Sequence, residues 1–257
     1  MQLSSGWAGC EFYYEEETDS TNLWLKRLAR EGAPHGTVAM AERQTAGRGR
    51  RGNQWKTLPG TAIAMSILLR PSFAPVHAPK LTLVMGLSVA QTLREEGVKA
   101  WIKWPNDVVI NKKKLCGILT EMSVKTPEAI DYVIIGTGLN VNVEEFPPEV
   151  SSVATSLKLE TGKDWDRMEL LKKILYTFSE NYEKFSETED LSLLRDAYSG
   201  LLINRQKKVR ILEDGGNWEG IARGINQEGE LMVEKEDGSL AAVSAGEVSV
   251  RGLYGYI

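Results

Sequence analysis

The sequence predicts an α+β fold in which a mixed sheet with helices is followed by a small β-barrel. Apolar residues keep helical spacing in two long stretches, 81–94 and 171–185, whereas most other apolar runs before residue 143 are short enough for strands. After about residue 204 the pattern changes to short strand-like runs separated by turns. We therefore predict one domain over residues 1–203 and a β-barrel domain over residues 204–257.

The first third of the chain is expected to supply three strands, at residues 11–14, 37–41 and 61–69. A helix is expected between the first two, because residues 18–22 are good N-cap types and leucines follow them with helical spacing. Gly32 is a natural end for this helix, since glycine readily adopts the left-handed conformation that often follows a helix.

The middle of the chain begins with a helix over residues 81–94 that is apolar on most sides and therefore expected to be buried. Gly97 closes this helix. Residues 111–114 are expected to form a hairpin loop between two of the strands that follow. Those strands are expected at residues 100–104, 108–110, 115–122 and 132–143, and the barrel includes strands at residues 207–212 and 231–235.

Composition argues against several classes of protein. No run of about eighteen apolar residues is present to span a membrane, and the N-terminus lacks the basic and apolar regions of a secretion signal. The two cysteines and two histidines are too few for a disulfide framework or a histidine-based zinc site, so a reducing cytoplasm is expected. The net charge of −4 leaves no overall footprint for nucleic acid.

A glycine- and arginine-rich loop follows the second expected strand. Residues 44–52 read Gln-Thr-Ala-Gly-Arg-Gly-Arg-Arg-Gly, and no acidic residue occurs between Arg43 and Lys56. Glycines let a backbone approach a ligand closely, arginines pair with carboxylate or phosphate, and Trp55 offers a flat face to an adenine ring. The pattern also fits an RNA contact or a merely flexible loop.

Three further segments carry residues suited to chemistry. Residues 103–107, Lys-Trp-Pro-Asn-Asp, end an apolar strand at a proline turn, so Lys103 should point from a rigid support into a cleft. Residues 112–119 carry three lysines, of which Lys114 enters an apolar strand and can face inward. Residues 136–142, Gly-Thr-Gly-Leu-Asn-Val-Asn, place paired glycines in a strand, which marks close approach of backbone or ligand. Taken singly, each segment also fits an ordinary strand end or a solvated loop.

Together with residues 19–22, Asp-Ser-Thr-Asn, these four segments resemble the biotin protein ligase family in their order and spacing. That family carries a GRGRRG loop, then KWPND, then a Lys-Leu-x-Gly-Ile-Leu strand, then a glycine-rich strand ending in asparagine. The resemblance covers nearly the whole chain. It implies a biotin synthetase-like catalytic domain of the type shared with class II aminoacyl-tRNA synthetases, followed by an SH3-like barrel.

The resemblance also implies a two-step reaction and its partners. Biotin carboxylate attacks the α-phosphate of Mg-ATP to give biotinyl-5′-AMP and pyrophosphate, and a lysine on the biotin carboxyl carrier domain of a carboxylase or decarboxylase then displaces AMP. The expected small molecules are therefore biotin, ATP and Mg²⁺, with no metal site assigned to the protein. Relatives include monomers and homodimers. Only about seventeen residues precede Thr18, which predicts a ligase without the DNA-binding domain that some members carry.

Joining two anions requires positive charge at the reacting centre. Lys103 is the first choice for this role because its strand and the adjacent proline hold it rigid. Arg48 and Arg50 are expected to clamp biotin carboxylate and phosphate, with Lys114 assisting on the same side. By resemblance, Asp107 orients the acceptor lysine or accepts its proton.

The ureido ring of biotin needs both donors and acceptors, which hydroxyl and amide side chains at the start of the first helix can supply. The residues expected to bind biotin are Ser20, Thr21, Asn22, Gln44, Arg48, Gly49, Arg50, Lys114 and Gly117. Those that match ATP contacts of the family are Arg50, Arg51, Trp55, Asn106, Lys114, Asn140 and Arg251. Gly136 and Gly138 are expected to allow close packing rather than to touch a ligand.

Two alternatives stay open on the sequence. A lipoate or octanoate ligase shares the fold and the acyl-adenylate chemistry, although the Gly/Arg loop and the intact Lys-Trp-Pro-Asn-Asp favour biotin. An RNA-binding module built on the basic loop would bind in a salt-sensitive manner without turning over ATP. Because residues 45–54 hold three glycines and three like-charged arginines, we also expect this loop to fold over bound ligands.

Overall fold

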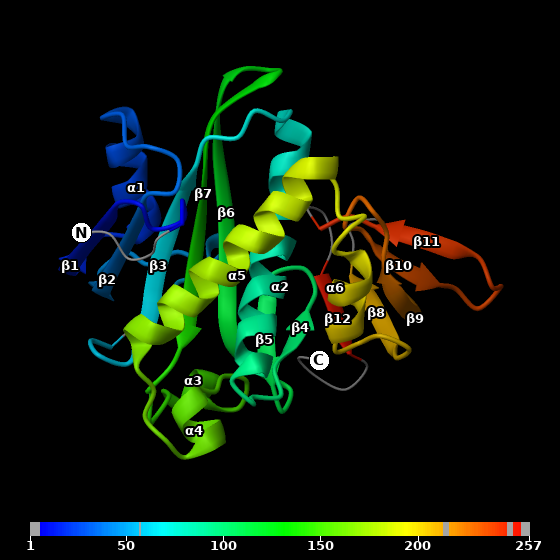
Figure 1. The fold of residues 1–257 in the computed structure, drawn as a ribbon. Helices are drawn as coiled ribbons and strands as arrows, with labels where there is room; N and C mark the ends of the chain where they lie inside the picture. Colours follow the sequence, from blue (N-terminus) through cyan, green and yellow to red (C-terminus); the bar gives the residue numbers. More distant parts are fainter. Residues whose placement is uncertain (1–5, 57, 213–215, 246–248, 253–257) are drawn as a thin grey trace.

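The computed structural model describes residues 6–56, 58–212, 216–245 and 249–252. Within these residues the chain forms a seven-stranded sheet in the order β1-β2-β3-β7-β6-β5-β4 and a five-stranded sheet in the order β11-β10-β9-β8-β12 (Figure 1). Helices cover both faces of the larger sheet, and the smaller sheet lies beside the edge formed by β4. The predicted α+β fold is confirmed.

The larger sheet is antiparallel except at one end, where β1 and β2 run parallel and are joined by helix α1 (Thr21–Arg30). Its strands are β1 (Phe12–Thr18), β2 (Val38–Gln44), β3 (Ala62–Leu69), β4 (Trp101–Lys103), β5 (Asp107–Ile110), β6 (Lys113–Thr126) and β7 (Ala129–Asn140). Each expected strand of this region is present. The turn between β5 and β6 is tighter than predicted, since Asn111 and Lys112 alone form it, both with positive φ.

The two long helices expected after α1 are also present. Helix α2 (Leu81–Glu95) is buried along most of its length, as predicted, because it lies between the sheet and helix α5 (Arg167–Thr188). Gly32 and Gly97 follow α1 and α2 with φ of +96° and +81°, which confirms them as helix ends. The shorter helices are the 3₁₀ turns η1 (Arg50–Gly52) and η2 (Pro75–Lys80), and α3 (Pro148–Ser151), α4 (Leu157–Thr161) and α6 (Arg195–Leu201).

Buried apolar residues form one cluster on each face of the larger sheet. On one face, Leu25 and Ala29 of α1 pack against Ala39, Leu68 and Ile134. Because Leu25 is fully buried, its truncation to alanine should cost about 2–5 kcal/mol of stability. On the other face, α2 and α5 pack in a larger cluster that continues into the C-terminal sheet. The small helix α1 is therefore held firmly enough to present its N-terminus as a fixed part of a site.

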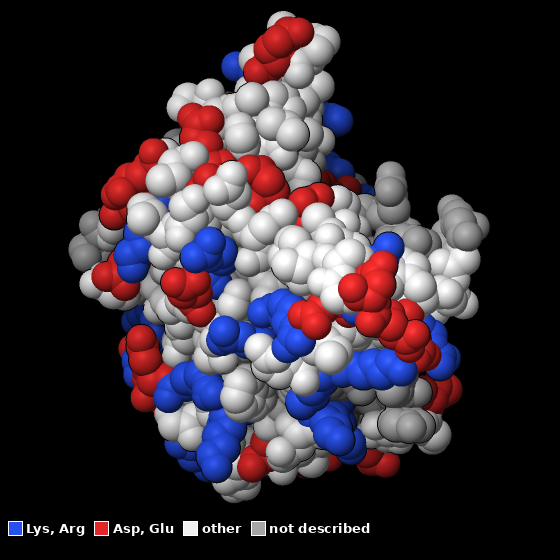
Figure 2. Space-filling model, turned by 90° about the vertical axis from the view of Figure 1, so that its right-hand side faces the viewer, with Lys and Arg blue, Asp and Glu red and all other residues white. Residues whose placement is uncertain are grey.

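The C-terminal segment forms an antiparallel sheet in place of the closed barrel that was predicted. Its strands are β8 (Lys208–Leu212), β9 (Trp218–Ile225), β10 (Leu231–Glu234), β11 (Leu240–Val243) and β12 (Ser249–Gly252). Among the described residues, the two edge strands β11 and β12 do not pair with each other, so the sheet is not closed. Figure 2 shows the face that carries this sheet, where Lys and Arg gather in the lower half and acidic groups lie above and among them. The domain boundary at residues 203/204 stays a prediction.

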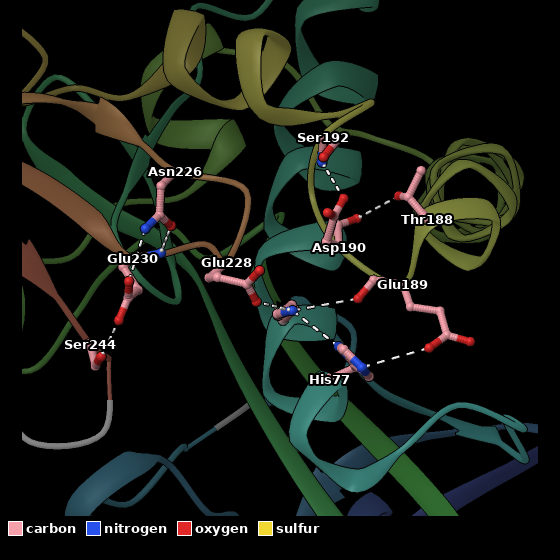
Figure 3. Close-up of polar contacts among 10 residues, drawn as sticks. His77, Thr188, Glu189, Asp190, Ser192, Asn226, Glu228, Glu230 and Ser244 are labelled. Atoms are coloured by element: carbon pink, nitrogen blue, oxygen red, sulfur yellow. Dashed lines mark hydrogen bonds and ion pairs between the residues drawn. The ribbon is translucent and has the colours of Figure 1, made fainter.

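One turn of the C-terminal sheet is fastened by three consecutive residues to the part of the chain that carries the larger sheet. The Leu191 backbone N–H donates to the Gln227 carbonyl at 2.8 Å, and Trp104 Nε1 donates to the Gly229 carbonyl at 3.0 Å. Between them, Glu228 pairs at 2.5 Å with the ammonium of Lys80, which is buried. Figure 3 shows Glu228, His77 and Glu189 converging on that ammonium. The residue next to Lys103 is thus tied directly to the C-terminal sheet.

Candidate active site

A cavity opens where the N-terminus of α1 and the loop after β2 meet strands β6 and β7. Most of its lining is polar or glycine, which suits a ligand that is recognised by hydrogen bonds along a narrow path. The lining residues are Ser20, Thr21, Asn22, Gln44, Arg48, Gly49, Arg50, Trp55, Met65, Asn106, Lys114, Gly117, Ile118, Leu119, Gly136, Thr137 and Gly138.

The start of α1 supplies a buried group of hydroxyl and amide side chains. Ser20 is the N-cap residue, but its side chain does not cap the helix and lines the cavity instead. The Thr21 backbone N–H donates to Gln44 Oε1 at 2.9 Å, which fixes the orientation of the Gln44 amide. Asn22 Oδ1 accepts from the Ser66 hydroxyl at 2.6 Å. Buried polar groups are costly unless they are paired, so this group has a defined pattern of donors and acceptors.

The basic loop, residues 45–56, folds back on itself beside this group. The Gly49 N–H donates to the Asn53 carbonyl at 2.7 Å, and the Trp55 N–H donates to the Gly47 carbonyl at 3.0 Å. Gly47 is required here because a Cβ atom at this position would lie only 2.1 Å from the Trp55 carbonyl oxygen. The loop therefore holds its arginines at the rim of the cavity.

The two arginines of the loop that the structure describes in full reach different partners. Arg48 Nη1 lies 3.2 Å from Glu121 Oε1 on β6. Arg50 donates to Asn106 Oδ1 at 2.9 Å and to the Ala245 carbonyl at 2.6 Å, so it joins the loop to the Lys-Trp-Pro-Asn-Asp turn and to the C-terminal sheet. Their guanidinium groups are suited to a carboxylate or a phosphate at this position.

Glycines on two neighbouring strands form a flat wall of the cavity. Gly117 of β6 pairs with Gly138 of β7, and the Trp55 indole lies against both. A Cβ atom at Gly138 would lie 2.3 Å from the indole, and one at Gly136 would lie 2.3 Å from Asn22 Oδ1. These contacts confirm that the glycines of residues 136–138 allow close packing.

Lys103 and Asp107 lie opposite each other on β4 and β5, at the ends nearest the Trp104–Pro105 turn. Both side chains are buried, with 6% and 8% of their surface exposed. Asp107 Oδ1 pairs at 2.7 Å with the ammonium of Lys114, which reaches the cavity. Burial and, secondarily, the charge of Asp107 raise the pKa of the Tyr198 hydroxyl above its ordinary value. The ammonium and carboxylate groups are thus set in a rigid, largely dry environment beside the cavity.

Most of the residues predicted from the sequence come together at this cavity. All of those predicted to bind biotin line it, as do Trp55 and Asn106. Lys103 and Asp107 are not part of the lining; Asp107 contacts it through Lys114, and Lys103 is paired with Asp107 on the neighbouring strand. Asn140 also lies outside the lining, where its Nδ2 donates to the Thr155 carbonyl at 3.1 Å. The side chains of Arg51 and Arg251 fall outside the described part of the structure.

Sequence reasoning missed Glu121 and Ser66. Glu121 accepts from Lys26 and from Asn22, each at 2.7 Å, and Ser66 contacts Thr21 and Asn22. Burial opposes ionisation of Glu121, but the hydrogen bonds from Lys26 and Asn22 hold the pKa of its carboxyl below the ordinary value. Glu121 stands at an alternating position of a strand, and its partners come from 73 or more residues away, so no local pattern identifies it.

Other side chains of the described residues bear on cofactors and membranes. No group of three or more His, Cys, Asp or Glu side chains in this part of the chain is arranged to hold a metal ion. Burial raises the pKa of the Cys116 thiol, so it behaves as a small apolar residue. Nor does any described helix have the length and apolar character that crossing a membrane requires.

Comparisons with known proteins agree with this geometry. Residues 14–140 match the model of the Biotin/lipoate A/B protein ligase family, and residues 207–251 match that of the Biotin protein ligase C terminal domain. The bifunctional ligase/repressor BirA of Bacillus subtilis is 37% identical over 92% of this chain and 73% of its own length. The biotin–[acetyl-CoA-carboxylase] ligase of Mycobacterium tuberculosis is 35% identical over 95% of this chain and 90% of its own.

A solved structure extends the likeness to three dimensions. The biotin protein ligase of Aquifex aeolicus, in complex with biotin and ATP, superposes with a TM-score of 0.82 and 35% identity, over 94% of this chain and 99% of that one. The chain belongs to the biotin protein ligase family and is an enzyme of that type.

Proposed function

We propose that this chain activates biotin with ATP as biotinyl-5′-AMP and transfers the biotinyl group to a lysine on a carrier domain of a biotin-dependent enzyme. The observation that carries the proposal is the joint lining of one cavity by the buried polar group of Ser20, Thr21, Asn22 and Gln44 and by the cations of the basic loop. A ureido ring matches the first set, and a carboxylate next to a phosphate matches the second.

The polar group also disfavours the lipoate or octanoate alternative. The acyl tail of either acid offers no hydrogen bond to the Ser20 hydroxyl or to the remaining donor and acceptor positions of Thr21 and Gln44, all of which line the cavity. Sites built to hydrogen-bond a ligand reject analogues that lack the polar group by large factors. The RNA-binding alternative is not favoured, because the arginines of the loop are directed to Glu121, Asn106 and Ala245 around a small cavity.

We assign roles to the residues around the cavity as part of this proposal. Arg48 and Arg50 bind the carboxylate and α-phosphate, and Trp55 and Asn106 contact the nucleotide. Lys103 and Lys114 stabilise the charge that develops as the carboxylate attacks. Asp107, held by Lys114, orients the amine of the acceptor lysine. Mg²⁺ enters with ATP, and the free thiols of Cys10 and Cys116 fit the cytoplasmic setting predicted above.

Exchange of labelled pyrophosphate into ATP tests the proposal. Biotin should support this exchange in the presence of Mg-ATP, whereas lipoate and octanoate should not. Addition of a biotin carboxyl carrier domain should then consume the adenylate and label one lysine. Exchange with octanoate or lipoate but not with biotin would overturn the proposal.

A further inference from the structure

Glu121 lies behind the wall of the cavity and contacts Asn22 and Arg48, which line the cavity, as well as Lys26 of α1. Its Oε2 accepts from Asn22 Nδ2 at 2.7 Å. Its Oε1 faces two cations, Lys26 Nζ at 2.7 Å and Arg48 Nη1 at 3.2 Å. The side chain is 18% exposed and does not line the cavity, so any effect on a ligand must pass through its partners.

The carboxylate fixes which way the Asn22 amide points. An ionised carboxylate can only accept, so the amide nitrogen of Asn22 must face Glu121 and the amide oxygen must face Ser66. The second proton of the amide nitrogen points toward the Leu119 carbonyl, 3.5 Å away. Gly136 makes room for this arrangement, since a Cβ atom there would strike Asn22.

The orientation of Asn22 in turn sets the hydroxyl groups of Ser66 and Thr21. Ser66 has one hydroxyl proton, and the Asn22 oxygen at 2.6 Å must take it. The Thr21 hydroxyl lies 2.7 Å from the Ser66 oxygen and 3.2 Å from Gln44 Oε1. Because the Ser66 proton goes to Asn22, the close Ser66–Thr21 contact needs the Thr21 proton, so Thr21 donates to Ser66. Thr21 lines the cavity, so it presents acceptor lone pairs there and no proton. An N–H group of a ureido ring requires an acceptor of this kind.

We propose that Glu121 is a positioning residue for biotin, which sets the donor and acceptor pattern of the cavity through Asn22, Ser66 and Thr21. The inference rests on the proposed function, because it takes the ureido ring of biotin as the group that reads this pattern. It concerns recognition of the ureido ring; of the residues that Glu121 contacts, only Arg48 is assigned to the reacting carboxylate and phosphate.

The variant Glu121→Gln should reverse the pattern without changing the size of the side chain. Lys26 and Arg48 both face the same oxygen of Glu121, so a glutamine must keep its oxygen toward them and turn its amide nitrogen toward Asn22. The Asn22 amide must then rotate to offer its oxygen, and its nitrogen donates to Ser66. Ser66 now donates to Thr21, and the Thr21 proton turns to Gln44 Oε1, 3.2 Å away. Gln44 Oε1 then accepts from both the N–H and the hydroxyl of Thr21, so the cavity offers fewer acceptor lone pairs to a ureido N–H group.

Calorimetric titration of the full chain with biotin measures the effect. Because an unmatched buried donor is costly, the Kd for biotin should rise by about tenfold or more in Glu121→Gln. The rate of adenylate formation at saturating biotin should change by less than about threefold, since the glutamine keeps an oxygen toward Arg48 and the other residues assigned to the reacting groups do not contact Glu121. The affinity for desthiobiotin, which keeps the ureido ring, should fall by the same factor. Glu17→Gln is the matched control, because Glu17 pairs with Arg43 on the neighbouring strands away from the cavity, and its Kd should equal that of wild type.

A double variant separates positioning from general damage. In Glu121→Gln with Asn22→Asp, the aspartate can accept both from Gln at position 121 and from Ser66, so the original pattern and net charge return. We expect biotin affinity to recover to within about threefold of wild type, as for a restored hydrogen bond. Wild-type affinity in Glu121→Gln, or no recovery in the double variant, would overturn the positioning role alone. Failure of the wild-type chain to bind biotin would overturn the proposed function and this inference with it.

Discussion

Arg50 joins the basic loop to two distant parts of the molecule, and its replacement tests how the reactive adenylate is retained. The guanidinium donates to Asn106 Oδ1 at 2.9 Å and to the Ala245 carbonyl at 2.6 Å. The variant Arg50→Met keeps the aliphatic part of the side chain and removes both bonds. We expect the loop to open more often and biotinyl-AMP to leave before a carrier lysine arrives.

The size of the effect follows from these two contacts. A hydrogen bond to a charged group contributes about 1.5–3 kcal/mol when buried, but Arg50 is only half-buried, so about 1–1.5 kcal/mol for each bond is a fair estimate. Loss of both then lowers the barrier to release by about 2–3 kcal/mol, which corresponds to a release about 30- to 150-fold faster.

Release can be measured after the adenylate is formed with labelled biotin and chased with unlabelled biotin. Labelling of lysines on an unrelated protein such as serum albumin provides a second readout, because escaped mixed anhydride reacts with exposed amines. The control is Arg43→Met, whose arginine is exposed and pairs with Glu17 outside the cavity. If Arg50→Met and Arg43→Met release the adenylate at the same rate and label albumin equally, the loop does not retain the intermediate.

Three further changes test other parts of the site. Lys103→Ala should slow adenylation on the order of 10²-fold while biotin affinity stays nearly constant, because a rigid cation acts mainly in the transition state; near-normal turnover would remove Lys103 from the catalytic residues. Asp107→Asn should slow transfer to the carrier on the order of 10²-fold and spare pyrophosphate exchange, and an equal loss in both steps would contradict its role with the acceptor. Glu42→Gln should lower the free energy of unfolding in urea by about 2–4 kcal/mol, because Arg167 pairs with Glu42 through both of its terminal nitrogens in a buried position. Burial opposes ionisation of Glu42, yet Arg167, the Gly60 N–H and Tyr14 hold the pKa of its carboxyl below the ordinary value of 4.5. The stability that this ion pair contributes is therefore complete above about pH 4.5 and is lost as the pH falls through the lower pKa of the folded state. If the difference in unfolding free energy between wild type and variant does not shrink in acid, the assignment is contradicted.

The sequence predicted the elements of the larger sheet because each carries its own local signal. Strand β3 and helix α2 are continuous apolar runs of the right length, and Gly32 and Gly97 mark the ends of helices. The short helices α3, α4 and α6 have seven residues or fewer, too few for a hydrophobic period to be recognised. Closure of the C-terminal barrel was predicted from the short strands and turns after residue 204 as well as from the resemblance, and it is not found among the described residues.

Residues of the site were predictable where chemistry and local sequence coincide. The basic loop and the Asp-Ser-Thr-Asn segment combine reactive residue types with a break between regular elements, and both line the cavity. Asn140 shows the opposite case, since its side chain at a glycine-rich strand end supports the Thr155 carbonyl and does not line the cavity. Glu121 could not be predicted, because its significance depends on Asn22, 99 residues away, whose amide it orients.

The charge around the cavity explains why retention of the intermediate depends on closure. The chain carries a net charge of −4, yet Arg48, Arg50 and Lys114 line the cavity and none of the described lining residues is acidic. Such a local excess attracts biotin and ATP, whose combined negative charge is large, and offsets their mutual repulsion. Once pyrophosphate leaves, the remaining adenylate carries little negative charge, so the same cations hold it more weakly. Hydrogen bonds that close the basic loop over the cavity, above all those of Arg50, must then help to retain an intermediate that electrostatic attraction holds less strongly.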